Sequence, residues 1–251
     1  MIKIYWDKDK ISMLTDQIDA VEHKHWALQL FLSLKDNLDI CISGKRIRCK
    51  GVVVNGNVSH SFSSDSRLHF SIIIGPASDT ASQLEKIIKS EDYYIFDNPD
   101  IVEAQNLAYE LVHNNELDAY HSLISRLYDC LGINEQVKIY DDRIKELLRY
   151  IECCNCDVQS ISTFADKVAL SPSRLSHLFR EQTGMPLKSY IQFHQMQKAF
   201  LALLNGENIT KAAMLANFDT PSHFAAVTKR MMGMPASLFL KDSVFLKVYD
   251  V

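Results

Sequence analysis

Three histidines near the N-terminus have the spacing of a metal or ligand site. His23 and His25 stand two positions apart, so an extended strand would place both side chains on one face, and His60 follows a predicted turn at residues 55–57. Two histidines from one strand and a third from a neighbouring strand are typical of a metal site. Gln29 stands near the position where such a site usually has a carboxylate. If the histidines form a pocket, we expect it to hold an organic effector rather than a catalytic metal. The alternative is that these are surface or hydrogen-bonded structural histidines.

A second cluster of reactive side chains follows a predicted helix over residues 141–152 and consists of Cys153, Cys154 and Cys156. Closely spaced thiols could bind zinc or sense oxidation. No second cysteine pair lies at zinc-finger spacing, so chance and helix-end packing are the alternative. We expect all six cysteines of the chain to be free thiols.

The remaining motifs give little support for an enzyme. Arg46, Arg48 and Lys50 share one face of a predicted strand, where they could hold an anionic effector or form a solvated outer face. The sequence has no glycine-rich phosphate loop, no nucleophilic serine elbow and no paired zinc-binding motif on a helix. We therefore expect no catalytic residues, no bound cofactor and no enzymatic activity.

The composition is that of a globular protein whose charge is unevenly distributed. Of its 251 residues, 47% are apolar and 23% are charged, and no apolar run approaches the length of a membrane span. The start of the chain lacks the pattern of an export signal, so we expect a cytoplasmic protein without membrane contact. Residues 1–139 hold 14 Lys/Arg against 20 Asp/Glu, and residues 140–251 hold 13 against 11. This balance favours an anionic partner for the C-terminal half.

Residues 1–132 predict a regulatory and dimerisation domain with a β part over about 1–76 and helices over about 78–131. The β part is predicted from short apolar runs with hairpin-type breaks between them, at residues 27–34, 38–42, 51–54 and 68–74. Apolar residues three and four positions apart then predict helices over 78–90, 99–113 and 116–131. The last two helices either cover the β domain or form a self-association surface.

Residues 133–251 predict an all-helical domain built on an internal repeat. Two stretches about 49 residues apart begin at Ser171 and Thr220, and each has a helix N-cap, a proline, an amphipathic helix and a closing Gly-Met-Pro. Each follows a shorter predicted helix, capped by Ser160 or Asn208, which makes two helix-turn-helix units. A predicted helix over residues 188–204 joins them.

The second helix of each unit has a face that could contact DNA. In the first unit the side opposite the buried stripe carries Ser173, Arg174, Ser176, His177 and Arg180. The matching positions of the second unit are Ser222, His223, Ala225, Ala226 and Lys229. The second face has fewer hydrogen-bond donors, so we expect the first unit to read most of the base sequence.

Over residues 141–242 the chain resembles the AraC/XylS family of bacterial transcription regulators. The resemblance depends on residues of both units, among them Phe164-Ala165, Ser171-Pro172-Ser173, Leu178-Phe179, Gly184, Tyr190, Ala213, Phe218, Phe224 and Gly233. It implies two helix-turn-helix units that bind DNA, often with an N-terminal β domain that senses a small molecule and helices that dimerise. The chain departs from the family pattern at Gln195, Gln197, Ala212, Thr228 and Leu240. These departures predict a second unit that packs less tightly and binds DNA less strongly.

The expected fold class is α+β: a small antiparallel, cupin-like β domain with helices, followed by an all-α domain of two helix-turn-helix units joined by a long helix. The expected function is sequence-specific DNA-binding regulation of transcription, responsive to an effector through the N-terminal domain. Double-stranded DNA, a small-molecule effector, RNA polymerase and a second copy of the chain are the expected partners. Two alternatives are a metal-dependent cupin enzyme fused to a helical module, and a protein-interaction factor that antagonises other regulators.

Overall fold

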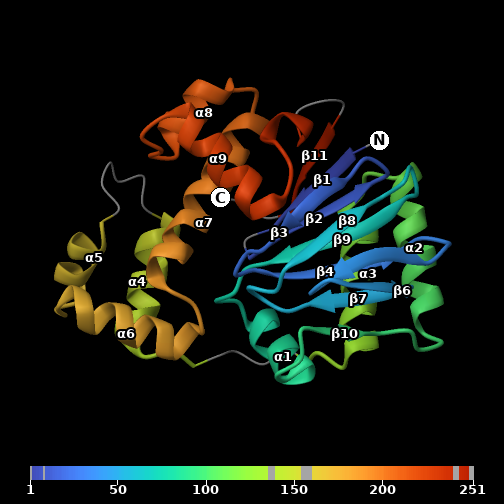
Figure 1. Cartoon of the computed structure of the whole chain (residues 1–251), viewed down its shortest axis with the longest axis horizontal. Helices are drawn as coiled ribbons and strands as arrows, with labels where there is room; N and C mark the ends of the chain where they lie inside the picture. The colour runs from blue at the N-terminus through green and yellow to red at the C-terminus, as the bar shows by residue number, and fades with distance from the viewer. Residues whose placement is uncertain (1, 8, 135–138, 154–159, 240–242, 249–251) are drawn as a thin grey trace. The chain divides into compact units, whose positions relative to one another are not determined.

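The N-terminal part of the chain forms two facing β-sheets (Figure 1). The structure is a computed structural model that describes residues 2–7, 9–134, 139–153, 160–239 and 243–248. The strands of the larger sheet are β1 (Ile2–Trp6), β2 (Lys10–Thr15), β4 (Leu28–Ser33), β7 (Gly51–Val54), β9 (His69–Ile74), β10 (Tyr93–Ile95) and β11 (Ser243–Lys247). Those of the smaller sheet are β3 (Asp19–His23), β5 (Leu38–Ile42), β6 (Lys45–Cys49) and β8 (His60–Ser63). Their spatial orders are β10-β7-β4-β9-β2-β1-β11 and β3-β8-β5-β6.

The central strands of the larger sheet are buried on both faces. On one face, Phe31 of β4 and His69 of β9 contact Phe62 of β8, with ring centroids 4.9 and 4.7 Å apart, so the second sheet covers this side. On the other face, Leu28, Leu30 and Leu32 belong to a core shared with helices. Burial on both sides explains why these strands occur as continuous apolar runs in the sequence rather than as an alternating pattern.

Three helices cover the second face of the larger sheet (Figure 1). They are α1 (Asp79–Ile88), α2 (Ile101–His113) and α3 (Leu117–Leu131). The apolar stripes of α2 and α3 pack into the core of the sheet, and Tyr120 of α3 stacks on Tyr5 of β1 with ring centroids 4.6 Å apart. Of the two alternatives predicted for these helices, covering the β domain is therefore the one that uses their main apolar faces.

The predicted fold class is confirmed, with one difference at the C-terminal end. Strand β11 pairs in parallel with β1, in a register that sets Ser243 opposite Ile2, whereas an all-helical end is predicted from the sequence. The other strand pairs of the structure are antiparallel in the part of the chain that it describes. The C-terminal strand thus extends the N-terminal sheet.

The chain forms two compact units, and the first is discontinuous in sequence. It comprises Met1–Val137 together with Arg230–Val251, and the second unit comprises Lys138–Lys229. The predicted division into residues 1–132 and 133–251 differs from this one at the C-terminal end, because β11 and the turn after the last helix lie against strands of the first unit.

The second unit is helical. Its helices are α4 (Asp142–Cys153), α5 (Ile161–Lys167), α6 (Pro172–Thr183), α7 (Leu187–Leu204), α8 (Ile209–Leu215) and most of α9 (Pro221–Met232), while the short 3-10 helix η1 (Ala236–Phe239) belongs to the first unit. Among the helices that the structure describes, none combines the length and apolar composition needed to span a membrane.

Candidate DNA interface and histidine cluster

The first helix-turn-helix unit consists of α5 and α6, and its caps are the predicted ones. The Ser160 hydroxyl accepts a hydrogen bond from the Thr163 amide at 3.1 Å, and the Ser171 hydroxyl accepts one from the Arg174 amide at 3.3 Å. Between the helices Ala169 has a left-handed backbone (φ 51°), which turns the chain tightly enough to bring α6 against α5.

The second unit, α8 and α9, repeats this construction. The Asn208 side chain accepts from the Lys211 amide at 2.9 Å, and the Thr220 hydroxyl accepts from the His223 amide at 3.0 Å. Asn217 has the left-handed backbone that Ala169 has in the first unit (φ 59°). Hence the internal repeat of the sequence is a repeat in three dimensions.

The predicted contact residues of α6 lie on one face that solvent can reach. Leu175, Leu178 and Phe179 are buried on the opposite side, as the apolar spacing requires. The residues exposed on the outer face are Ser173, Arg174, His177 and Arg180. Ser176 is half-buried, and its hydroxyl donates to the Pro172 carbonyl at 2.8 Å, so this donor is already used within the helix.

The matching face of α9 is exposed but carries less hydrogen-bonding chemistry. Its exposed residues are Ser222, His223, Ala225, Ala226 and Lys229. The His223 ring lies 3.4 Å from a carboxylate oxygen of Asp219, between Nδ1 and Oδ2. Two alanines therefore occupy the middle of this face, where α6 has Ser176 and His177.

The interior of the second helix-turn-helix unit is relevant to the prediction that this unit packs less tightly than the first. Thr228 is fully buried, and its hydroxyl has no hydrogen-bond partner among the described residues. A buried hydroxyl without a partner destabilises a fold by about 1–3 kcal/mol. Ala212 is also fully buried, whereas Gln195 of α7 donates to the Asn217 carbonyl at 3.1 Å and so holds the turn between α8 and α9. Leu240 lies outside the described residues.

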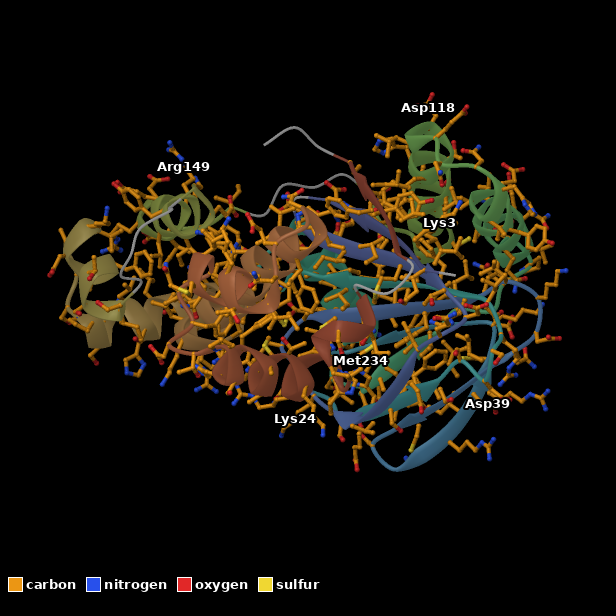
Figure 2. All side chains as sticks on the ribbon, turned by 90° about the horizontal axis from the view of Figure 1, so that it is seen from above. Lys3, Lys24, Asp39, Asp118, Arg149 and Met234 are labelled. Carbon is orange, nitrogen blue, oxygen red and sulfur yellow. The ribbon has the colours of Figure 1, made fainter. Side chains whose placement is uncertain are left out.

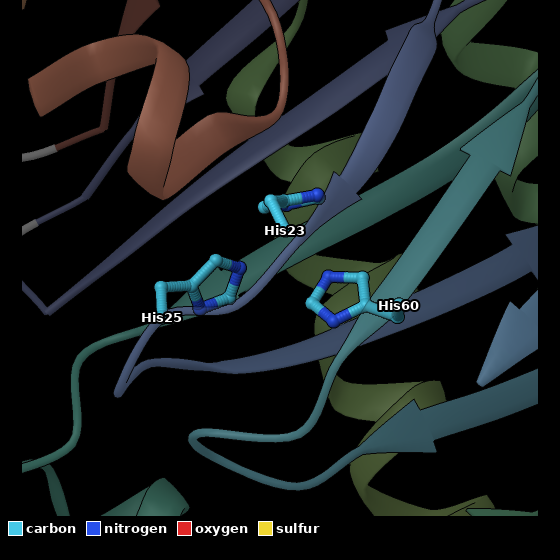
Figure 3. Close-up of side chains that lie close together, drawn as sticks. All are labelled: His23, His25 and His60. Atoms are coloured by element: carbon cyan, nitrogen blue, oxygen red, sulfur yellow. The ribbon is translucent and has the colours of Figure 1, made fainter. Parts of the chain in front are cut away.

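The three N-terminal histidines come together in the compact unit of residues 1–137 and 230–251, as their spacing predicts (Figure 3). His23 ends β3, His25 follows in the loop and His60 begins β8, and a ring nitrogen of each lies within 4.8 Å of those of the others. Lys24, between the first two, points outward and is exposed (Figure 2). Burial lowers the pKa of His25 to about 4 and that of His60 to about 3, so both rings are neutral at neutral pH.

The space beside these histidines is very small. A cavity of about 10 Å³ is lined by His23, His25 and Gln29 and by apolar side chains that include Met232 and Met234. Such a volume holds one water molecule or one ion. It is too small for an organic effector, the ligand predicted for these residues if they form a pocket.

A larger cavity lies elsewhere in the first unit. Its volume is about 280 Å³, and its lining includes Lys35, Arg67, His69 and Tyr109. Arg67 is paired with Asp39 at 3.3 Å, and the Lys35 ammonium lies over the Tyr109 ring, 4.7 Å from its centroid. No motif of the sequence marked this cavity, because its walls come from separate strands and from one helix.

The two remaining predicted clusters are a basic strand face and a group of cysteines. Arg46 and Arg48 are exposed on the outer face of β6, and Lys50 follows it. Cys154 and Cys156 lie outside the described residues, as does the side chain of Cys153. The three cysteines Cys41, Cys49 and Cys130 are free thiols, as expected.

Sequence comparison finds relatives of the C-terminal part of the chain. Residues 164–242 match a family described as a helix-turn-helix domain. The arabinose operon regulatory protein of Escherichia coli (strain K12) is 36% identical over 102 residues, which cover 39% of this chain and 35% of that protein. The chain therefore spans about a third of the length of that relative.

Structure comparison extends the similarity to nearly the whole chain. A structure of ToxT from Vibrio cholerae has a TM-score of 0.59 at 13% identity and covers 92% of this chain and 97% of its own. A structure of ToxT from strain SCE256 with a bound unsaturated fatty acid has a TM-score of 0.55 at 12% identity and covers 93% and 95%. At this level of identity the likeness shows a shared fold.

Proposed function

We propose that this chain is a sequence-specific DNA-binding regulator of transcription of the AraC type. Residues 164–242 match a helix-turn-helix family, and the chain is similar over 102 residues to the arabinose operon regulatory protein. The observation that carries the proposal is the repeated pair of capped helices, in which α6 and α9 each present an exposed face. In helix-turn-helix proteins the second helix of each pair enters the major groove. The 18 residues of α7 between the pairs correspond to roughly 27 Å at the rise of an α-helix, which suits successive grooves about 34 Å apart.

The distribution of donors supports a division of labour between the two helices. On α6, Arg174, His177 and Arg180 are exposed and able to donate to base edges or phosphates, whereas the middle of the α9 face is Ala225 and Ala226. We propose that α6 reads the base sequence and that α9 contributes phosphate contacts and shape. Two methyl side chains fit thymine methyl groups but read no hydrogen-bond pattern.

The test begins with selection of duplex DNA from a random library by the full chain, followed by affinity measurements on the enriched sequence. Arg180→Ala should weaken binding by about tenfold, since one good base or phosphate contact contributes about 1–3 kcal/mol. Arg149→Ala is the matched control, because Arg149 is also exposed but lies on α4, outside both helix pairs (Figure 2). Serine at Ala225 or Ala226 should change affinity less than alanine at His177 or Arg180.

Added salt provides an independent readout. Binding should weaken as salt rises, and a variant that loses one phosphate contact should show a salt slope smaller by about one. If no duplex is enriched, the proposal fails and the antagonist alternative gains support. If all reading-face variants bind like wild type, the face is wrongly assigned.

We propose that an organic effector binds in the 280 Å³ cavity rather than beside the three histidines. The cavity is lined by ring side chains, by Leu68, by the cations Lys35 and Arg67 and by three aspartates, Asp16, Asp36 and Asp39. This lining suits a small molecule with an apolar body and a polar end group. A protein of the same fold, ToxT, has a structure with an unsaturated fatty acid bound. Fatty acids are therefore the first compounds to titrate in the DNA-binding assay, and Leu68→Trp, which fills the cavity, should abolish any effect.

The proposed protein partners are a second copy of the chain and RNA polymerase. The apolar stripe of α2, which includes Ile101, Ala104 and Leu111, is buried. Val102 and Tyr109 lie outside this stripe and are 48% and 37% exposed, so we propose their side of α2 as the dimer surface. Sedimentation of wild type and of Val102→Glu tests it, because a charge at the centre of a contact should dissociate the dimer. Transcription from a promoter that contains the selected site tests the contact with polymerase.

A further inference from the structure

The three histidines are placed by the pairing of β3 with β8. His23 is opposite His60 in the register of these strands, after a bulge between Ala20 and His23. Their ring centroids are 4.4 Å apart, and the His25 ring lies 5.5 Å from His23 and 5.2 Å from His60. Two side chains from one segment and one from the next strand thus meet at a single point (Figure 3).

Backbone carbonyl groups fix which nitrogen of each ring has the proton. Nδ1 of His23 lies 2.8 Å from the Val21 oxygen, Nδ1 of His25 lies 2.8 Å from the Ala27 oxygen, and Nδ1 of His60 lies 2.9 Å from the Val58 oxygen. A carbonyl oxygen only accepts hydrogen bonds, so Nδ1 must be the protonated nitrogen in all three rings. Nε2 of each neutral ring then has the lone pair, and the His23 ring also interacts with the backbone of His60. This is the arrangement in which protein imidazoles bind metals, with the other ring nitrogen donating to a carbonyl.

Gln29 makes the cluster more than a group of neighbouring rings. Its side-chain oxygen lies 3.2 Å from Nε2 of His25 and 3.0 Å from Nε2 of His60. With the proton on Nδ1, each of these contacts sets one lone pair against another and has no hydrogen between them. Two arrangements remove the conflict: a cation between the three atoms, or an exchange of the amide oxygen and nitrogen that lets Gln29 donate to both rings.

The surroundings favour a small cation as the occupant. His25, His60 and Gln29 are 6%, 2% and 7% exposed. The cavity of about 10 Å³ that His23, His25 and Gln29 line has room for one ion. No lysine or arginine lines this cavity among the described residues, so no positive side chain opposes a cation there. Imidazole nitrogen is a preferred ligand of zinc, copper, iron and nickel.

We infer that His23, His25 and His60 bind one divalent transition-metal ion through Nε2, with the Gln29 oxygen as a fourth ligand. Four ligands at about 2.1 Å in a tetrahedron lie about 3.4 Å apart. The ring nitrogens, which are within 4.8 Å of one another here, would have to close by up to about 1.4 Å on binding. Ring rotation and small shifts of the loop that holds His25 supply a movement of that size.

The experiment uses the full chain, freed of metal by dialysis against a chelator, and Zn²⁺ as the probe. Competition with a chromophoric chelator should give one Zn²⁺ per chain, and Co²⁺ in its place should give the visible absorption of a four-coordinate site. His60→Ala should weaken Zn²⁺ binding by at least about 100-fold, since even loss of an outer-shell group costs roughly 10–100-fold. His121→Ala is the matched control, because His121 is an exposed histidine on α3 outside the cluster. Mg²⁺, which prefers oxygen ligands, should not compete.

Gln29→Glu keeps the inference testable if His60→Ala fails to fold. A carboxylate at position 29 adds a negative ligand, so Zn²⁺ should bind at least about tenfold more tightly than to wild type. Equal affinity of wild type, His60→Ala and His121→Ala would mean adventitious binding at surface groups and would overturn the inference. So would a wild-type chain that binds no Zn²⁺ and whose NMR spectrum shows the Gln29 amide protons donated to the Nε2 atoms of His25 and His60.

Discussion

Replacing Gly233 by alanine should destabilise the compact unit of residues 1–137 and 230–251 far more than the same change at Gly132. Both glycines follow a helix and have nearly the same left-handed backbone, with φ of 68° at Gly233 and 66° at Gly132. A side chain in that conformation costs about 1–2 kcal/mol at either position. The two sites differ in what surrounds them, so the pair separates backbone strain from packing.

The additional cost at Gly233 comes from its contact with β3. A Cβ there would lie 2.6 Å from Nδ1 of His23 and 2.7 Å from the Val21 carbonyl oxygen, whereas a Cβ on Gly132 would have no atom within 4 Å. The Gly233 carbonyl also accepts a hydrogen bond from the Val21 amide at 3.2 Å, so the turn cannot move away without losing that bond. Overpacking of this kind costs about 1–3 kcal/mol, which gives a total of about 2–5 kcal/mol for Gly233→Ala.

Urea unfolding followed by tryptophan fluorescence measures this difference directly. The chain has two tryptophans, Trp6 and Trp26, and both belong to the first unit, so the signal reports that unit alone. With a slope of about 2 kcal/mol per molar urea, Gly233→Ala should unfold at a midpoint lower by about 0.5–1.5 M than that of Gly132→Ala. Equal midpoints for the two variants would refute the packing of this turn against β3.

Three further predictions concern single side chains. Burial lowers the pKa of His69 to about 4, so as the pH falls the unfolded chain binds a proton at His69 before the folded chain does. The free energy of unfolding should therefore drop by about 2 kcal/mol between pH 6.5 and 5. His69→Phe should remove this drop, which urea unfolding at the two pH values measures. Tyr5→Phe should leave the melting temperature unchanged or raise it, because the buried Tyr5 hydroxyl has no hydrogen-bond partner among the described residues. Tyr120→Phe should lower the melting temperature, because the Tyr120 hydroxyl is hydrogen-bonded to the Ser12 hydroxyl at 3.0 Å. A lower melting temperature for Tyr5→Phe would contradict this reasoning. Ser171→Ala should destabilise the helical unit of residues 138–229 by about 1 kcal/mol, measured by helical circular dichroism during unfolding. An unchanged unfolding transition would rule out the cap.

The helices could be predicted from the sequence because their signals are local. Ser160, Ser171 and Asn208 each cap the helix predicted for them, and apolar residues three and four positions apart gave the buried side of each helix. Cap and stripe both lie within a few residues of the helix they define. The same local signals predicted the outward faces of α6 and α9, whose residues are exposed except for the half-buried Ser176.

The sheet edges could not be predicted, because strand pairing depends on distant segments. Nothing within Ser243–Lys247 indicates that its partner is Ile2–Trp6, at the opposite end of the chain. The histidine cluster shows the same limit in another form. The spacing of His23, His25 and His60 predicted that they would meet. The size of the cavity beside His23 and His25 depends on Met13, Phe31 and other side chains from separate strands.

The parallel pairing of β1 with β11 has a consequence for any attempt to divide this chain. A fragment that ends at residue 137 would lack β11 and would leave the outer side of β1 as an open edge, with backbone amide and carbonyl groups unpaired. Open edges of this kind pair with other chains, so the isolated fragment would tend to assemble edge to edge. Self-association of such a fragment would then report a missing strand, and it would be no evidence for the dimer of the intact protein.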